Sequence, residues 1–512
     1  MNPRVKRLLL LALAAALLSG VSQVQRSLNR DRDRLGLTRV EPLKNAPPVL
    51  AFTTVALGGF RGLISNLLWI RASDLQDEDK FFEMQQLADW ITKLEPHYVQ
   101  VWLVQAWNMA YNISVKFKET EFGQYPDRWR WVRAGIVLLR DEGLRYNPYE
   151  PLLYRELAWF FQHKMGANLD DAHNYYKMKW YLEMAEVFKT ARPNFDEFIQ
   201  PTTEDALRRL NLLTNTYKMD PVFLKAVDER YGPLEWRLPE AHAIYWAARG
   251  LEMAKLNERK IDPEELIKLR RVIYQSMQLA FQRGKVIPLI GVNGIDLGPN
   301  LDLIPKVNAA YEQAMEEDVP NREHIKTGHR NFVKDAIYFL FTHNRMRDAA
   351  QWYRYLAERY PDKTILDGDP KSFPRNLTLD EYCVGRVQVD IEETDRNRIK
   401  QTLEGMLVTS FRSLALGEDE EAAGLLVLAQ RVRELYLSKI AGREMAIGLP
   451  TFEEIYNEVR NAILDPEEGL PKEYRDILRT KLGMPPEAAA PVAPPTNAPP
   501  ATTSATNAPP AR

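Results

Sequence analysis

The chain of 512 residues contains a single cysteine, Cys383. One thiol cannot form a disulfide within the chain or a cysteine-based metal site. A lone cysteine most often behaves as a small buried apolar residue, so we predict burial rather than catalysis for Cys383. Histidines are also few, seven in all, and none stands in an H-E-x-x-H pattern. The sequence therefore predicts no metal site and no cofactor.

The sequence also lacks a charge excess of either sign. Lys and Arg number 68 against 70 Asp and Glu, which gives a formal net charge of −2. This balance offers no electrostatic reason to expect nucleic acid as a partner. Glycine-rich nucleotide fingerprints, the G-x-S-x-G motif of hydrolases and the kinase motifs do not occur. We accordingly predict no catalytic residue and a protein that is not an enzyme.

An N-terminal apolar run is the first feature that is present. Basic residues precede an uncharged stretch from Leu8 to Val21. This length suits the core of a signal peptide and is short for a membrane span of roughly 20 residues, although extension to Val24 gives a marginal one. No clean A-x-A cleavage site follows, which favours an uncleaved anchor; a buried core helix is the alternative. Residues 1–25 are predicted to be a signal peptide or membrane anchor.

This segment also sets the expected location of the protein. An uncleaved helix would anchor the chain to the membrane by its N-terminus. We expect the body to be extracytoplasmic (periplasmic), and secreted if the segment is cleaved. Arginines follow the run as well as precede it, so flanking charge leaves the orientation open.

Composition divides the rest of the chain. Residues 26–48 are charged and end in Asn-Ala-Pro-Pro, which indicates a linker. Val49 to Phe60 predicts the first buried helix of the body, with membrane contact as the alternative. Apolar residues then recur at three- and four-residue spacing as far as about residue 482, so the fold class is all-α. We expect helical regions at 49–283 and 330–482, joined by an irregular connection at 284–329.

The last segment, residues 483–512, is rich in Pro, Ala, Thr and Asn. It repeats Asn-Ala-Pro-Pro at 497–500 and 507–510, and its only charged residues are Glu487 and Arg512. Such a composition cannot bury enough apolar surface to offset the entropy of ordering the chain. We predict a disordered tail that is a spacer, a glycosylated tail or simply a loose end.

A repeat-like order of residues is clearest between Arg330 and Asp362. It comprises a turn residue, a small residue, an aromatic residue, a further packing residue and a closing proline. These are Asn344, Ala349, Tyr353, Leu356 and Pro361. Asn344 stands where a glycine is usual, and asparagine is among the few residues that tolerate the left-handed conformation there.

The same order of small and large residues recurs near the start of the body. A first unit closes at Pro96 and has its turn at Asp79-Lys-Phe; a second closes at Pro148 after an inserted loop at 114–128. A third unit turns near Gly166. The packing positions are Ala72, Leu75, Ala88, Ile91, Trp102, Ala106, Leu157, Ala158, Phe161, Ala172 and Tyr176.

These positions resemble the tetratricopeptide repeat family, whose helix-turn-helix unit has a period of about 34 residues. The resemblance covers about 62–180 and 330–362, and is only generic elsewhere. It implies an irregular right-handed solenoid of antiparallel helix pairs, with an N-terminal hydrophobic helix and a disordered C-terminal tail. A plain α-helical bundle is the alternative.

In this family the first helix of each pair lines a concave surface that binds a peptide or protein segment. There are ten candidate groove positions, eight of which the resemblance implies, while Asn108 and Asn112 are added because they lie beside Trp107. They are Asn66, Trp69, Trp107, Asn108, Asn112, Arg155, Trp159, Gln162, Lys334 and Tyr338. Asn108 and Asn112 lie one turn apart and offer amides that would clamp the backbone of an extended peptide. Trp107 and Trp159 are equally well explained as core residues.

We therefore expect a non-enzymatic, membrane-tethered scaffold that binds a peptide or protein partner in an envelope-associated complex. The alternative is an all-helical enzyme whose site is assembled from scattered residues of the helical body. A deep cavity with two or more converging carboxylates would favour the enzyme.

Overall fold

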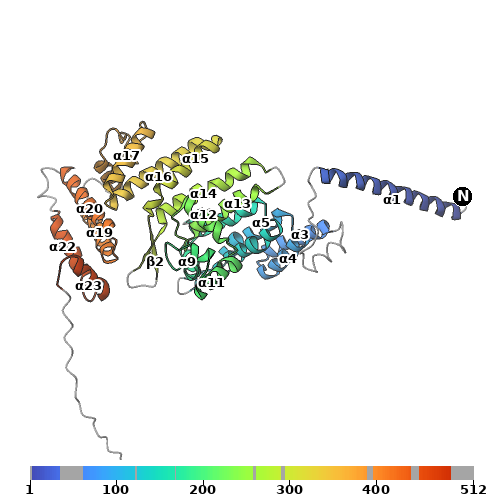
Figure 1. The fold of residues 1–512 in the computed structure, drawn as a ribbon, viewed down its shortest axis with the longest axis horizontal. Helices are drawn as coiled ribbons and strands as arrows, with labels where there is room; N and C mark the ends of the chain where they lie inside the picture. The colour runs from blue at the N-terminus through green and yellow to red at the C-terminus, as the bar shows by residue number, and fades with distance from the viewer. Residues whose placement is uncertain are drawn as a thin grey trace, which may run out of the picture. The chain divides into compact units, whose positions relative to one another are not determined.

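The computed structural model describes residues 3–34, 61–120, 124–167, 169–257, 261–289, 294–388, 396–439 and 449–485. Over these ranges the protein is all-α, since every regular element except one short hairpin is a helix (Figure 1). The predicted fold class is confirmed at that level. Two predicted features, the buried helix at 49–60 and most of the tail, lie outside the described residues.

The chain divides into two compact units. The first comprises residues 1–289 and 293–333, and the second residues 290–292 and 334–512. The division falls within helix α16 (Arg322–Thr342), close to residue 330, the predicted start of the C-terminal helical region.

The first unit contains the regular elements up to α16. They are α1 (Pro3–Arg34), α3 (Arg61–Asp77), α4 (Phe81–Leu94), α5 (Val99–Trp107), η2 (Asn108–Ile113), η3 (Ser114–Lys116), α6 (Pro126–Val137), η4 (Leu138–Gly143), α7 (Leu144–Tyr146), α8 (Pro151–Trp159), η5 (Phe160–Gly166), α9 (His173–Phe188), α10 (Asp196–Ile199), α11 (Glu204–Asn211), η6 (Leu212–Thr216), α12 (Pro221–Tyr231), α13 (Pro239–Ala254), α14 (Pro263–Arg283), β1 (Lys285–Pro288), β2 (Ile295–Gly298), η7 (Leu301–Leu303), α15 (Ile304–Glu317) and η8 (Val319–Asn321).

Helix α1 continues to Arg34, beyond the end of the predicted segment 1–25 and into the predicted linker. Among the residues that the structure describes, no helix is both long enough and apolar enough to cross a membrane. The predicted apolar run begins at Leu8, and the side chains of residues 6–11 lie outside that description.

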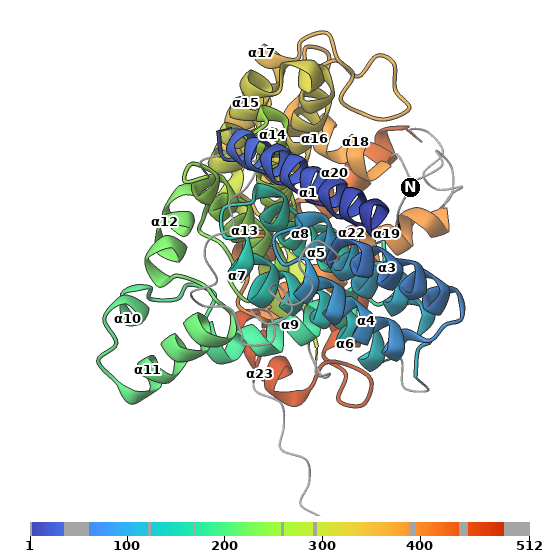
Figure 2. The same cartoon turned by 90° about the vertical axis from the view of Figure 1, so that its right-hand side faces the viewer.

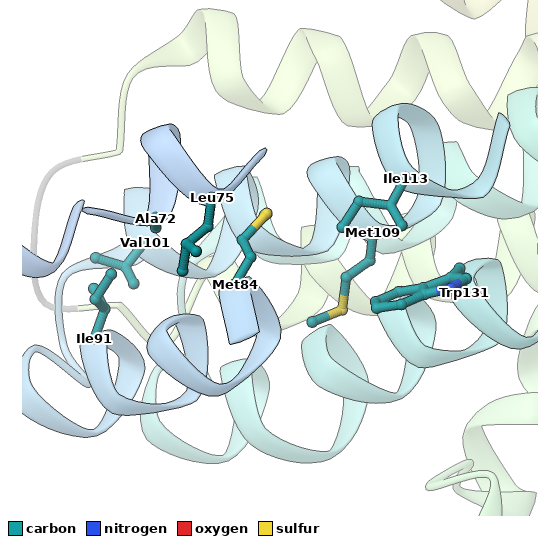
Figure 3. Packing of buried hydrophobic residues seen from close by; sticks show 8 residues of the cluster. All are labelled: Ala72, Leu75, Met84, Ile91, Val101, Met109, Ile113 and Trp131. Carbon is teal, nitrogen blue, oxygen red and sulfur yellow. The ribbon is translucent and has the colours of Figure 1, made fainter. Parts of the chain in front are cut away.

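Helices α3 and α4 form the first antiparallel pair of the body, and they lie side by side in Figures 1 and 2. Asp79, in the turn between them, has a positive φ of 56°. Their buried side chains join those of α5, η2 and α6 in one apolar cluster, in which Met109 and Ile113 point toward Trp131 (Figure 3). Burying one such aliphatic or aromatic side chain stabilises the fold by about 1.5–3 kcal/mol.

The positions that carried the repeat prediction in this region are buried. Ala72, Leu75, Ala88 and Ile91 are each at most 4% exposed. Helix α6 then approaches α5 closely, because a Cβ added to Gly135 would lie only 2.9 Å from the carbonyl oxygen of Ala106. Small residues therefore set the distance between these helices, as they do in other closely packed helix pairs.

The first unit ends differently from the prediction of an irregular connection at 284–329. Strands β1 and β2 pair antiparallel, with Lys285 opposite Gly298 and Pro288 opposite Ile295. Helix α15 follows and packs on α14. Gly298 ends β2, and Pro305 lies at the start of α15, where a helix accepts the fixed φ of proline.

The second unit begins with the end of α16. Its further helices are α17 (Met346–Arg359), α18 (Leu379–Gln388), α19 (Arg396–Ala415), α20 (Asp419–Lys439), α22 (Phe452–Ile463) and α23 (Lys472–Lys481). Asn344 lies between α16 and α17 with a φ of 55°, which confirms the left-handed conformation predicted for it. Cys383 on α18 is fully buried, as predicted, and burial raises the pKa of its thiol.

Candidate functional site

The predicted groove positions are distributed over three parts of the structure. Asn66 is exposed on α3, and Trp69 packs partly against the apolar cluster of Figure 3. Lys334 and Tyr338 belong to the second unit, where Lys334 pairs with Asp367 at 3.4 Å and Arg386 lies over the Tyr338 ring. The remaining positions lie on two neighbouring helices of the first unit, α5–η2 and α8–η5.

These two helices change from α to π geometry at the same point. Helix α5 ends at Trp107 and η2 begins at Asn108; α8 ends at Trp159 and η5 begins at Phe160. The two tryptophans are thus equivalent positions, 52 residues apart in the sequence. Segments η4 and η6 of the same unit also have π geometry, so this geometry by itself does not identify a site.

Each tryptophan stacks on a ring one turn further along. Trp107 stacks on Tyr111 with ring centroids 5.5 Å apart and an interplanar angle of 18°. Trp159 stacks on His163 with centroids 4.5 Å apart and an angle of 10°. Tyr111 and His163 then meet across the two helices, because the Tyr111 hydroxyl lies 3.2 Å from Nδ1 of His163.

A guanidinium group extends this row at one end. Cζ of Arg155 lies 5.0 Å from the centre of the Trp159 ring, a distance at which the cation is attracted to the ring face. Arg155 also donates to Glu156 at 2.8 Å, so its charge is paired. We call the row formed by Arg155, Trp159, His163, Tyr111 and Trp107 the aromatic ladder.

The ladder is partly open to solvent. Trp107 is 43% exposed, and its other four members are neither fully buried nor fully exposed. Both tryptophans therefore combine packing with accessibility, which is what a side chain needs to contact a ligand. Large planar side chains of this kind contribute contact area with little loss of conformational entropy on binding.

The imidazole and the phenol of the ladder are both uncharged at neutral pH. Burial lowers the pKa of His163, and the positive charges of Lys164 and Arg155 lower it further. Burial likewise raises the pKa of Tyr111. The phenol therefore keeps its proton and can donate it to Nδ1 of a neutral imidazole, whose own proton is then on Nε2.

A buried ionic group lies beneath the ladder. Lys164, which is 3% exposed, donates to Asp170 at 2.5 Å and lies 4.9 Å from the centre of the Tyr111 ring. Asp170 also accepts from the Tyr176 hydroxyl and lies 3.5 Å from Arg128. Burial lowers the pKa of Lys164. Burial acts to raise the pKa of Asp170, but the hydrogen bond and the positive charge of Lys164 outweigh it, so the pKa of Asp170 is lowered. This group fixes the position of Tyr111 and of the segment that carries His163.

The loop after the first helix pair positions the two ladder helices. The carbonyl oxygen of Pro96 accepts from the Trp102 indole at 2.9 Å and from the Asn147 amide at 2.8 Å. Trp102 belongs to α5, and Asn147 comes a few residues before α8, so one carbonyl connects both helix starts. Pro151 at the beginning of α8 has no N–H to leave unsatisfied there.

The two asparagines beside the ladder bond to each other. Nδ2 of Asn112 donates to Oδ1 of Asn108 at 2.6 Å, and Asn108 is only 8% exposed. Of the two amides, Asn112 is therefore the one that presents polar atoms to a ligand. The prediction that both act as a clamp is narrowed to Asn112, with Asn108 positioning it.

Gln162 does not face the groove. It is 4% exposed and donates to the carbonyl oxygen of Val272 on α14 at 3.2 Å, so it belongs to the packing between η5 and α14. Within a π-helical segment the backbone hydrogen bonds run from i to i+5, so side chains are no longer directed as α-helical spacing implies. This change of direction is the reason that the predicted position differs from the observed one.

Tyr111 and His163 are not among the groove positions predicted from the sequence. The signal that identifies them is their spacing, since each lies four residues after a groove tryptophan. No family model, curated protein or solved structure matches the chain in the comparisons with known proteins.

Proposed function

We propose that this chain is a non-enzymatic scaffold of tetratricopeptide type that is tethered to a membrane by its N-terminal segment. It binds an extended segment of a protein partner across the aromatic ladder. The single observation that carries the proposal is the ladder itself, a continuous row of partly exposed planar side chains on two neighbouring helices.

The position of the ladder in the repeats supports this function. Its residues lie on the first helices of the second and third predicted units, which are the helices that line the concave surface of a helical solenoid. The α-to-π changes at Trp107 and Trp159 bring equivalent side chains of two units into one row. A ligand that runs across successive repeats would meet the same chemistry twice.

The alternative, a helical enzyme, requires two or more carboxylates that converge in one cavity. Three pockets lined by described residues each contain a single carboxylate, namely Glu317, Glu204 and Asp296. Glu317 is moreover paired with Arg270 at 2.8 Å. No described feature favours this alternative over binding.

The test is co-purification of the full chain from detergent-solubilised membranes. A Trp107→Ala/Trp159→Ala variant should lose its co-purifying partners. The matched control is Trp90→Ala, which removes a tryptophan that is 47% exposed on α4, outside the ladder. If the double variant remains helical by circular dichroism and retains every partner, the ladder is not the binding surface. A chain lacking residues 1–25 that fractionates like the full chain would contradict the tether.

A further inference from the structure

A cavity of the first unit lies among four helices, away from the aromatic ladder. Helices α12, α13, α14 and α15 all contribute to its wall, and each of them packs on the next in a closed ring. The volume of the cavity is about 300 Å³. Pockets for small molecules have volumes of roughly 300–1,000 Å³, so this cavity has room for a ligand at the small end of that range.

The wall of the cavity is mainly apolar. Tyr231 of α12 and Tyr274 of α14 contribute ring surface. Aliphatic side chains come from α13, α14 and α15; they are Leu251, Ala254, Leu266, Ile273, Ala310 and Ala314. Free energy is gained when an apolar ligand covers such a wall and removes it from water. The cavity therefore suits a ligand with an apolar body.

Positive charges exceed negative ones among the lining residues. Arg230, Lys255 and Arg270 are cations, whereas Glu317 is the one carboxylate of the lining. Nε of Arg270 lies 2.8 Å from the Glu317 carboxylate, so these two charges balance. Cζ of Arg230 lies 5.0 Å from the centre of the Tyr231 ring, and no described residue supplies Arg230 or Lys255 with a carboxylate. Two positive charges of the cavity thus remain uncompensated.

The guanidinium group of Arg230 lies close to a neutral phenol. Burial raises the pKa of Tyr231, and the positive charges of Arg230 and Arg270 act against that rise. The Tyr231 hydroxyl therefore keeps its proton at neutral pH and can donate a hydrogen bond. Charged and neutral donors placed together in this way suit the two oxygens of a carboxylate. Because Glu317 already pairs with Arg270, Arg230 is the guanidinium that can bind a ligand.

We propose that this cavity binds a small monocarboxylate with an apolar body. The carboxylate bonds to Arg230 and the Tyr231 hydroxyl, and the body covers the aliphatic wall formed by α13, α14 and α15. An amine would meet two uncompensated cations, and a purely polar acid would leave the aliphatic wall in water. The cavity shares no residue with the aromatic ladder, so this site goes beyond the proposed function and is tested independently of it.

The test is isothermal titration calorimetry of the detergent-solubilised full chain with 4-phenylbutyrate, a carboxylate that carries a phenyl ring. We expect saturable binding with a Kd on the order of 0.1 mM, the affinity that ligand efficiency allows for a molecule of about twelve non-hydrogen atoms. Two matched probes separate charge from apolar surface. 4-Phenylbutanol lacks the charge and butyrate lacks the ring, and each should bind about tenfold more weakly or worse.

Variants of the wall place the binding in this cavity. Arg230 is exposed, so Arg230→Gln leaves the core intact, and it should weaken 4-phenylbutyrate binding about tenfold. Lys268→Gln is the matched control, because it removes a cation of α14 outside the cavity lining, and it should leave the affinity unchanged. Ala310→Leu fills part of the cavity and should abolish saturable binding; in the same detergent it also measures uptake of the probe by micelles.

Three results would overturn the inference. They are the absence of saturable 4-phenylbutyrate binding, equal affinities for the acid and the alcohol, and an unchanged affinity in Arg230→Gln. The last of these decides the question even if Ala310→Leu is destabilised, since circular dichroism and thermal unfolding show whether Arg230→Gln folds like the wild type. Partner binding through Trp107 and Trp159 is unaffected by any of these outcomes.

Discussion

His242 gives the structure a stability that depends on pH. It is 1% exposed on α13 and is surrounded by rings, with those of Trp180 and Phe161 at 4.9 and 5.4 Å. Its Nε2 lies 2.9 Å from the carbonyl oxygen of Trp236, which can only accept, so Nε2 carries the proton of the neutral imidazole. Burial lowers the pKa of His242 to about 3; the hydrogen bond to Trp236 opposes this, and the charge of Arg140 adds to it.

The direction of the pH dependence follows from the different protonation of His242 in the folded and unfolded chain. An unfolded chain takes up a proton on this imidazole as the pH falls through about 6.5, whereas the folded chain does not until the pH is near 3. The unfolded state therefore binds more protons between these values, and the free energy of unfolding decreases as the pH falls. At about 1.4 kcal/mol per pH unit, the loss from His242 is about 2 kcal/mol at pH 5.

Urea unfolding of the wild type and of His242→Gln, followed by tryptophan fluorescence, measures this quantity. Glutamine retains a donor for the Trp236 carbonyl and does not titrate. The difference in unfolding free energy between the two proteins should shift by about 2 kcal/mol in favour of the variant from pH 7.5 to pH 5, since other titrating groups cancel. Ile244→Val on the same helix is the control, with a loss of about 0.5–1.5 kcal/mol at both pH values. A difference that is independent of pH for His242→Gln would refute the reasoning.

Two further predictions concern the packing around the ladder and between helices. Asp170→Asn leaves the buried ammonium group of Lys164 without its counterion and should reduce the unfolding free energy, measured by urea titration, by about 3–5 kcal/mol. A Lys164→Met/Asp170→Asn double variant should recover part of this loss. No recovery would show that the two charges act separately. Gly250→Ala places a Cβ 2.6 Å from that of Tyr154 and should reduce the free energy of unfolding by about 1–3 kcal/mol. Gly405→Ala, with open space around it on α19, should be neutral or stabilise the protein by up to about 1 kcal/mol. Equal effects of the two substitutions in thermal unfolding would contradict this difference in packing.

Local signals in the sequence were sufficient where the structure follows from neighbouring residues. The apolar spacing predicts the helices, and Asn344 predicts the left-handed turn between α16 and α17. The resemblance to tetratricopeptide repeats gives Trp107, Arg155 and Trp159 as groove positions. It does not show where a helix widens to π geometry, because that change depends on how η2 and η5 pack against each other and against α6, α9 and α14.

The sequence by itself determined that the protein is helical and that Cys383 is buried. These properties depend on residue type and local periodicity. Only the tertiary structure decided that Tyr111 and His163 join two tryptophans 52 residues apart into one ladder, and that Gln162 turns away from it. The physical reason is that contacts between helices, together with the buried Lys164–Asp170 pair, fix side-chain directions that no local pattern encodes.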